Sequence, residues 1–305
     1  MDEGNNEVRI AVGAATDAGG RDGNEDAVLI AEIPPVARGA EIADAGTLMA
    51  LADGMGGHQR GEVASRLAIE TVQAALVSNP HTDMALLLKQ AFREANRTIF
   101  RNGREAGDGA MMGTTLVVAA TRGKYVTIAN VGDSRAYLVR ANRLTQITQD
   151  HSLVAEQVSQ GTLTQQEARE SPHRNIVTHA LGQREKLDQK MPNIFELTLL
   201  PEDRLLLCSD GFYDVVEDDD FVSVLLRNDP DSAARRLVEL ANERGTTDNV
   251  SAVVAEVTPV RVLEPVLAGA GADRGGLGTY LVPALVLLGA VVFIALVILA
   301  LALLG

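Results

Sequence analysis

The chain has 305 residues, of which 46% are apolar and 22% are charged, and this composition supports one large domain with a hydrophobic core. Its formal net charge of -14 argues against a nucleic-acid partner, because phosphate backbones recruit surfaces that are rich in Lys and Arg. The single cysteine, Cys208, excludes an intrachain disulfide, and the apolar run around it predicts a buried thiol in a reducing cytoplasm.

The first predicted segment is a flexible N-terminus at residues 1–7, which is polar and lacks the basic and apolar regions of a secretory signal. Beyond it, apolar and β-branched runs bounded by Gly, Asp or Asn are typical of strands. These runs lie at residues 8–15, 47–52, 114–120, 125–131, 136–140, 204–208 and 250–257.

Helical periodicity interrupts the strands. Apolar residues spaced three or four apart predict amphipathic helices at residues 61–77, 83–102 and 231–244. The acidic run at residues 217–220 is expected to cap the start of a further helix. Because strands and helices come in groups, the sequence indicates an α+β fold, and we predict a sandwich of two mostly antiparallel β-sheets flanked by helices.

A long irregular segment at about residues 150–182 contains two short helical pieces. Such inserts in compact domains are often functional, so we interpret this one as a candidate flap, with a surface excursion that has no role as the alternative. The flap belongs to a predicted domain at residues 8–258.

The C-terminal part is expected to be a linker at residues 259–279 followed by a transmembrane tail anchor at residues 280–305. Its apolar run is free of charge and, at about 1.5 Å per residue, is long enough to cross a hydrocarbon core of about 30 Å. A buried core helix is the alternative. Arg261 and Arg274 precede the run, so the positive-inside bias predicts a single-pass protein of the inner or cell membrane whose main domain is cytoplasmic.

Four aspartates lie at the edges of strand-like runs: Asp26, Asp53, Asp210 and Asp248. Magnesium and manganese prefer oxygen ligands and keep several waters, so a few aspartates from separate strands can hold two such ions. Arg21 precedes Asp26 closely enough for its guanidinium group to clamp a phosphate on the metal. This pattern points to phosphoryl chemistry.

Seven motifs in a fixed order give the chain a resemblance to metal-dependent Ser/Thr protein phosphatases of the type 2C (PPM) family, in particular its bacterial branch. The resemblance covers residues 8–257 and implies the type 2C phosphatase fold, with a dinuclear manganese or magnesium centre whose bridging water attacks phosphorus. The motifs are Asn24–Asp26, Ala52–His58, Met112–Thr115, Asn130–Arg135, Asp150–Ser152, Ser209–Gly211 and Asp248–Ser251.

The resemblance also implies metal ligands. Asp53 would bridge both ions, and the carbonyl of Gly54 would bind one of them, since a glycine has no Cβ to hinder the approach. Asp210 and Asp248 would complete the other side of the centre.

Other acidic residues would act less directly. Asp26 and Glu25 would hold ions largely through ordered waters, and Arg21 would grip the substrate phosphate. A third, weaker ion is implied at Asp133 together with Asp210, with a plain turn residue as the alternative for Asp133.

The match to the family is imperfect at two positions, Met55 and Tyr213. Met55 stands where eukaryotic members have the histidine proposed as general acid, and His58 is either a general acid or a loop residue that caps the following helix. Tyr213 replaces the usual tryptophan at a position expected to serve core packing. His151 is expected to order a loop by hydrogen bonding rather than to act in catalysis.

The function implied is that of a membrane-tethered phosphatase, which removes phosphate from Ser and Thr of proteins and opposes a cytoplasmic Ser/Thr kinase at the same membrane. Two alternatives stay open at this point. One is a catalytically silent scaffold of the same fold, and the other is a metal phosphohydrolase that acts on nucleotides or small phosphoesters.

Overall fold

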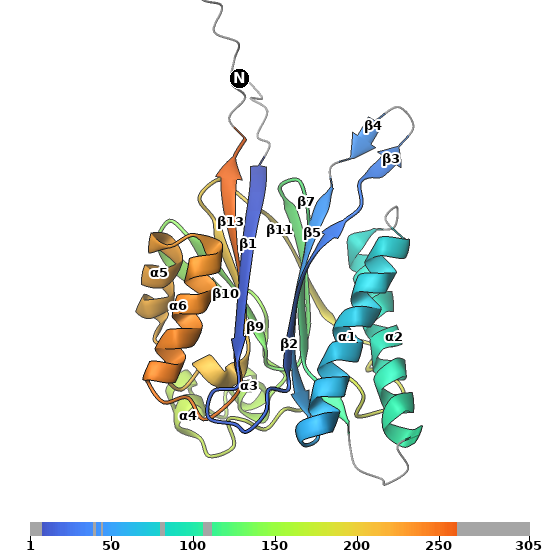
Figure 1. Cartoon of the computed structure of the whole chain (residues 1–305). Helices are drawn as coiled ribbons and strands as arrows, with labels where there is room; N and C mark the ends of the chain where they lie inside the picture. Colours follow the sequence, from blue (N-terminus) through green and yellow to red (C-terminus); the bar gives the residue numbers. More distant parts are fainter. Residues whose placement is uncertain (1–7, 39–40, 44, 80–82, 106–111, 261–305) are drawn as a thin grey trace, which may run out of the picture. The chain divides into compact units, whose positions relative to one another are not determined.

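Two antiparallel sheets face each other in the computed structural model, which describes residues 8–38, 41–43, 45–79, 83–105 and 112–260 (Figure 1). The first sheet consists, in spatial order, of β1 (Val8–Asp17), β13 (Val250–Pro259), β12 (Arg204–Cys208), β9 (Arg135–Arg140) and β10 (Arg143–Gln146). The second consists of β11 (Asn193–Thr198), β8 (Tyr125–Val131), β7 (Leu116–Arg122), β5 (Gly46–Met55) and β2 (Asp26–Ile33), with β6 (Gly113–Thr114) paired to β5. Strands β3 (Val36–Arg38) and β4 (Glu41–Ala43) pair with each other.

Helices cover the outer face of each sheet (Figure 1). Helices α1 (His58–Ser78) and α2 (Met84–Glu105) lie on the second sheet, and α5 (Asp218–Arg227) and α6 (Pro230–Glu243) lie on the first. Two short helices, α3 (Leu153–Ser159) and α4 (Gln165–Glu170), occupy the segment between β10 and β11. The predicted sandwich of antiparallel sheets flanked by helices is therefore confirmed.

Three apolar layers hold these elements together. One lies between the sheets and includes Leu51, Val117, Leu207 and Val253, and the other two lie between each sheet and its helices. Because both faces of the sheets are covered, the central strands are apolar at nearly every position, and the first six residues of β7 are all buried. The uniformly apolar runs in the sequence have this origin.

Several boundaries differ from the predictions. The helix expected at 61–77 begins at His58, and the strand expected at 114–120 is divided at Thr115 into β6 and β7. Strands β10 and β11, which were not predicted, lie at the edges of their sheets and carry many exposed or half-buried residues. Their sequences consequently lack the apolar pattern of the central strands.

Two local predictions are confirmed. The acidic run caps α5, since the Glu217 side chain accepts from the backbone of Asp220 and the Asp220 side chain accepts from the Glu217 N–H at 3.0 Å. The thiol of Cys208 is fully buried.

The predicted flexible N-terminus, nearly all of the linker and the whole tail anchor lie outside the described residues. In the part of the chain that the structure describes, no helix combines the length and apolar character needed to cross a membrane.

Candidate metal centre

The pairing of β2 with β5 places two of the four aspartates side by side. Asp26 is the register partner of Asp53, and residues directly opposite in an antiparallel pair have Cβ atoms about 4.5–5.5 Å apart. Asp26 is buried, and its Oδ2 accepts a hydrogen bond of 2.9 Å from Ser209 Oγ. This bond joins the second sheet to the end of β12 in the first.

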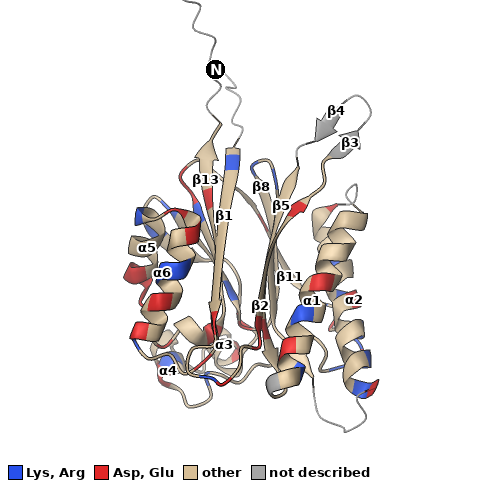
Figure 2. Ribbon diagram, viewed as in Figure 1, with Lys and Arg blue, Asp and Glu red and all other residues tan. Residues whose placement is uncertain are grey.

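The other two aspartates come from neighbouring strands of the first sheet. Asp210 follows β12 and begins a 3-10 turn (Asp210–Phe212), and Asp248 lies just before β13. The carboxyl groups of Asp210 and Asp53 are close enough for each to shift the pKa of the other. Both sheets therefore bring their aspartates to the same end of the sandwich, where Figure 2 shows acidic segments beside α3.

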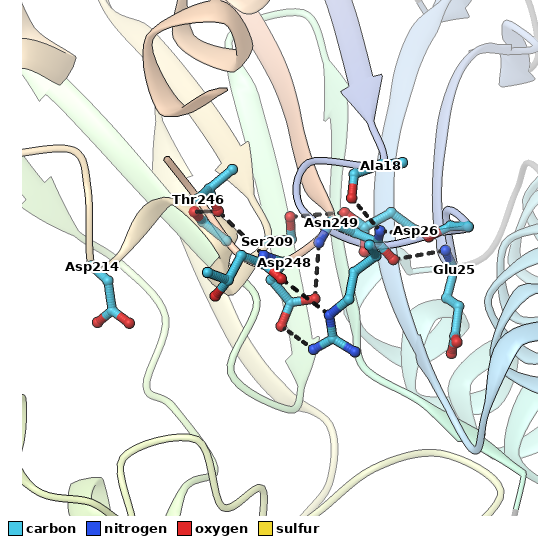
Figure 3. Close-up of polar contacts among 12 residues, drawn as sticks. Ala18, Glu25, Asp26, Ser209, Asp214, Thr246, Asp248 and Asn249 are labelled. Atoms are coloured by element: carbon cyan, nitrogen blue, oxygen red, sulfur yellow. Dashed lines mark hydrogen bonds and ion pairs between the residues drawn. The ribbon is translucent and has the colours of Figure 1, made fainter. Parts of the chain in front are cut away.

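Asn249 ties the loop before β2 to the start of β13 (Figure 3). Its side chain donates to the carbonyls of Ala18 at 2.9 Å and Gly23 at 2.8 Å, and it accepts from the N–H of Glu25 at 2.8 Å. A side-chain amide has both donors and an acceptor, so one residue satisfies three backbone groups. This contact holds Glu25 and Asp26 against Asp248, a role that no pattern in the sequence indicates for Asn249.

Arg21 lies at the exposed edge of this group. Its Nη2 forms an ion pair with Asp248 Oδ2 at 2.7 Å, and its Nε donates to the carbonyl of Thr247 at 3.2 Å. The Arg21 side chain remains 57% exposed. Its position is close to a predicted metal ligand, and its Nη1 makes no hydrogen bond within the described residues.

Two threonines hold the backbone of Asp53, although their place in the sequence indicates only close packing. The Asp53 N–H donates to Thr115 Oγ1 at 2.9 Å, and Thr114 Oγ1 donates to the Asp53 carbonyl at 2.8 Å. Thr115 Oγ1 in turn lies 2.7 Å from Ser134 Oγ. The break between β6 and β7 falls at Thr115.

Asp133 is buried in the turn between β8 and β9 and belongs to a dense polar network. The hydroxyl of Tyr213 donates to the Asp133 carbonyl. The Arg135 guanidinium group lies 3.6 Å from the centre of the Tyr213 ring and forms an ion pair of 2.6 Å with Asp150, the residue that begins the predicted flap. Tyr213 therefore does more than fill the core: it links the Asp210 turn to Asp133.

His151 orders the same turn from the other side. Its Nδ1 accepts from the N–H of Gly132 at 3.0 Å, and its Nε2 lies 3.0 Å from Asn193 Nδ2. Burial, followed by the neighbouring His179, lowers the pKa of His151 to about 4. The ring is neutral at physiological pH and has the loop-ordering contacts that were expected of it.

Burial and mutual repulsion raise the pKa values of the clustered carboxyl groups. Burial is the largest cause at every one, and charges of neighbouring aspartates add to it. The pKa is raised to about 7 for Asp26, about 8 for Asp133 and about 6 for Asp210, and well above its usual range for Asp53. A cluster of this kind holds its full negative charge only when cations compensate it.

Two buried oxygens in the centre also lack a hydrogen-bond partner: Asp26 Oδ1 and Asp210 Oδ1. Unpartnered buried acceptors are unfavourable, and a cation or its bound water would satisfy them. Among the described residues, however, no three His, Cys, Asp or Glu side chains converge on one point as a closed metal site. Ions that keep several waters need few direct carboxylate ligands, so the open arrangement suits magnesium or manganese better than a metal with a full protein shell.

Gly54 is required for a reason that the sequence did not reveal. A Cβ at Gly54 would lie 2.1 Å from the carbonyl oxygen of Gly61 in α1, and a Cβ at Gly61 would lie 1.8 Å from Glu25 Oε2. The two glycines let the start of α1 pack against the end of β5, with the Glu25 carboxylate beside them. Close approach of backbones thus accounts for Gly54 independently of any ion.

His58 is the first residue of α1, and Gly57 occupies the N-cap position. The expected alternative that His58 caps the helix is therefore wrong, because the cap residue is Gly57. The side chain of His58 lies outside the described part of the structure, and its assignment as a general acid stays a prediction.

A cavity of about 670 Å³ adjoins the carboxylate cluster. Asp133, Asp210 and Asp248 line it on one side, and residues of the 150–182 segment line it on the other. Arg174 of that segment makes a two-pronged contact with Asp214, with distances of 3.0 and 2.7 Å. The cavity is large enough for a phosphorylated side chain and part of its peptide.

Known proteins share this architecture and sequence. The family model for protein phosphatase 2C matches residues 37–244. The chain belongs to the protein phosphatase 2C family. It is 39% identical over 225 residues to the serine/threonine protein phosphatase PstP of Mycobacterium tuberculosis, a match that covers 73% of this chain and only 43% of PstP. It is 34% identical to the serine/threonine phosphatase stp of Listeria welshimeri over 214 residues, which are 68% of this chain and 84% of that protein.

A solved structure of the PstP catalytic domain in complex with two manganese ions superimposes with a TM-score of 0.68 and 35% identity, covering 82% of this chain and 99% of that one. The agreement extends over the whole sandwich described above. The superposition shows that this member of the protein phosphatase 2C family shares both sheets and their covering helices with the PstP catalytic domain.

Replacement of Tyr213 by Phe is expected to destabilise this member of the family by about 1 kcal/mol, the usual net value of one hydrogen bond. The ring would keep its stacking on Arg135, while the Asp133 carbonyl would lose its donor. Thermal unfolding should show a melting temperature lower by roughly 2–4 °C. Tyr125→Phe, at a tyrosine that is 63% exposed, is the matched control, and an equal change in both variants would contradict a role for the Tyr213 hydroxyl.

Proposed function

We propose that the protein is a metal-dependent Ser/Thr protein phosphatase that hydrolyses phosphoserine and phosphothreonine in proteins. The observation that carries this proposal is the cluster of buried and half-buried aspartates with raised pKa values and two unpartnered oxygens, in a chain of the protein phosphatase 2C family. Two divalent cations would supply an activated water and would neutralise charge on the phosphoryl oxygens. The manganese ions of the PstP catalytic domain support the same ion type here.

The residues present fit two manganese or magnesium ions. Asp53 lies between Asp26 on its own sheet and Asp210 on the other, which suits a ligand shared by both ions, with the Gly54 carbonyl beside it. Asp210 and Asp248 would complete the direct ligands.

The remaining acidic residues would act at longer range. Asp26 and Glu25 would hold metal-bound waters, since hydrated ions accept carboxylates in this way. Asp133, buried and electrostatically coupled to Asp210, would hold a third ion with that residue.

Arg21 would bind the substrate phosphate. Its Nε and Nη2 are directed to Thr247 and Asp248, which orients the guanidinium plane and leaves Nη1 for a phosphoryl oxygen. His58 stays a candidate for the general acid that protonates the leaving alkoxide. Retention of Arg21 and all four aspartates argues against a catalytically silent scaffold.

The activity experiment uses manganese and three substrates: a phosphothreonine peptide, p-nitrophenyl phosphate and ATP. The proposal expects metal-dependent phosphate release from the peptide. Hydrolysis that prefers ATP would favour the alternative of a small-phosphoester phosphohydrolase, and absence of hydrolysis with every substrate would favour the silent scaffold.

We also propose that the domain is anchored to the inner or cell membrane by residues 280–305, stays in the cytoplasm and opposes a Ser/Thr kinase at that membrane. The uncharged apolar run of the sequence supports the anchor, and the phosphatase activity proposed above supports the kinase. Deletion of residues 281–305 is expected to move the protein from the membrane to the soluble fraction while phosphopeptide hydrolysis is retained. Membrane retention of the truncated protein would refute the anchor.

A further inference from the structure

A second cavity lies outside the carboxylate centre. It has a volume of about 500 Å³, opens to solvent between α2 and the start of β11, and shares no lining residue with the cavity beside the aspartates. We call it the basic pocket, and it is lined by Lys89, Arg93, Gln149, Gln189, Lys190, Pro192, Asn193, Ile194 and Phe195. Three of these residues are cationic and none is acidic, in a protein whose formal net charge is -14.

The three cations of the basic pocket have no anionic partner among the described residues. Two other arginines of the same helix are paired: Arg97 lies 3.2 Å from a Glu94 oxygen and Arg101 lies 3.4 Å from the other. Lys89 and Arg93 stand four residues apart on α2, a like-charge spacing that weakens a helix. This pair of like charges does not stabilise α2, and a bound anion would reduce the repulsion between Lys89 and Arg93.

The remaining lining residues make the pocket suitable for an anion carried on a peptide. Asn193 and Gln149 offer polar side chains, while the half-buried Ile194 and Phe195 offer apolar surface. Lysine binds phosphate as a point charge, and arginine binds two of its oxygens at once. A phosphorylated side chain with its flanking residues matches this combination better than a small inorganic ion does.

The basic pocket is also connected to the candidate metal centre. Asn193 Nδ2 lies 3.0 Å from His151 Nε2, and His151 Nδ1 accepts from the N–H of Gly132 at 3.0 Å. Gly132 directly precedes Asp133, so two hydrogen bonds separate the pocket from the turn that carries this predicted metal ligand. The basic pocket and the turn that carries Asp133 therefore belong to one hydrogen-bonded network.

We infer that the basic pocket binds a second phosphoryl group of the substrate, so that the enzyme selects proteins phosphorylated at two nearby residues. This inference rests on the proposed phosphatase function and names its substrate class. The phosphoryl dianion would contact Lys89, Arg93 and Lys190, and Ile194 and Phe195 would contact the adjoining peptide.

The test compares a peptide that carries one phosphothreonine with peptides that carry an added phosphoserine about three to six residues away, which spans roughly 10–20 Å in an extended chain. The full-length protein with manganese should prefer one doubly phosphorylated peptide by about tenfold in kcat/KM through a lower KM, the size expected of a charge-assisted hydrogen bond. The charge-reversed variant Lys89→Glu/Arg93→Glu should lose this preference while hydrolysing the singly phosphorylated peptide and p-nitrophenyl phosphate as the wild type does.

The matched control is Arg97→Glu/Arg101→Glu, which makes the same charge change on the same helix outside the basic pocket. Absence of a preference at every spacing, or an equal loss in the control, would overturn the inference in favour of general electrostatic attraction.

A binding measurement separates this inference from the proposed function. Calorimetric titration of the doubly phosphorylated peptide into Asp210→Asn, with and without the Lys89→Glu/Arg93→Glu change, reports on the pocket even if no phosphate is released. The pocket is supported if the Lys89→Glu/Arg93→Glu change weakens binding of the doubly phosphorylated peptide and leaves binding of the singly phosphorylated peptide unchanged. If inorganic phosphate competes at the pocket as well as the peptide does, the site belongs to free phosphate and the inference about substrate selection is wrong.

Discussion

Asp210→Asn is expected to lower manganese-dependent hydrolysis of a phosphothreonine peptide by roughly 10³-fold, because a metal site supplies several kcal/mol of transition-state stabilisation. The same change should raise the melting temperature of the metal-free protein. Burial raises the pKa of Asp210 to about 6, so its charged form is unfavourable at pH 7.5, and the neutral amide of similar shape removes that cost. The measurement pairs phosphate release with thermal unfolding in the presence of a chelator.

Opposite changes in activity and metal-free stability distinguish loss of a ligand from loss of the fold. Asp219→Asn, at an exposed aspartate in the first turn of α5, is the control and should change neither quantity appreciably. A variant of Asp210 that retains full activity would remove this residue from the metal centre. One that is inactive because it melts at lower temperature would instead give Asp210 a structural role.

The metal-free protein is expected to lose stability as the pH rises from 6.5 to 8.5. The folded pKa is raised to about 7 for Asp26 and about 8 for Asp133, so the folded state binds protons that the unfolded chain releases. The stability that such a carboxyl group contributes is fully present below its pKa in the unfolded chain. It is lost as the pH rises through its pKa in the folded protein. A difference of one between the folded and unfolded pKa corresponds to about 1.36 kcal/mol, so the melting temperature should fall by several degrees.

His151 sets the lower limit, pH 6.5, of the range in which the carboxyl groups are tested. Its pKa is lowered to about 4, so its contribution to stability falls only when the pH drops below about 6.5, where it opposes that of the carboxyl groups. Above pH 6.5 the contribution of His151 no longer changes with pH. The experiment records thermal unfolding with a chelator and with manganese, and manganese should stabilise the protein most at pH 8.5, where its ligands are deprotonated.

Asp133→Asn provides the comparison for this second prediction. It removes the group with a pKa of about 8 and one charge that acts on Asp53, so the fall in melting temperature between pH 7.5 and 8.5 should become smaller. A metal-free protein whose stability is constant over this range would mean that burial and mutual repulsion do not raise the pKa values of these aspartates.

Much of the fold follows from local sequence pattern. The central strands are covered on both faces, so the runs at 125–131 and 204–208 have apolar residues at consecutive positions and are recognisable without a structure. The edge strands β10 and β11 face solvent and lack that pattern, which explains why they were missed. The ends of helices were displaced because caps such as Gly57 depend on backbone conformation rather than on periodicity.

The candidate site was predictable where its residues are acidic and lie beside strands. Asp26, Asp53, Asp210 and Asp248 carry a chemistry that residue type alone reveals, and motif order identifies their family. The neutral residues that support them carry no such signal. Ser209 is an ordinary serine until the two sheets meet and its hydroxyl reaches Asp26.

The sequence by itself determined the sandwich class, the family and the acidic residues of the centre, because burial patterns and short motifs are properties of neighbouring residues along the chain. Only the tertiary structure decided how these residues are held. The register of β2 on β5 sets Asp26 opposite Asp53, the Asn249 amide joins segments more than 200 residues apart, and Tyr213 reaches the Asp133 carbonyl. Contacts of this kind depend on the relative placement of distant strands, and hydrogen bonds and buried charges are sensitive to distances that no local pattern encodes.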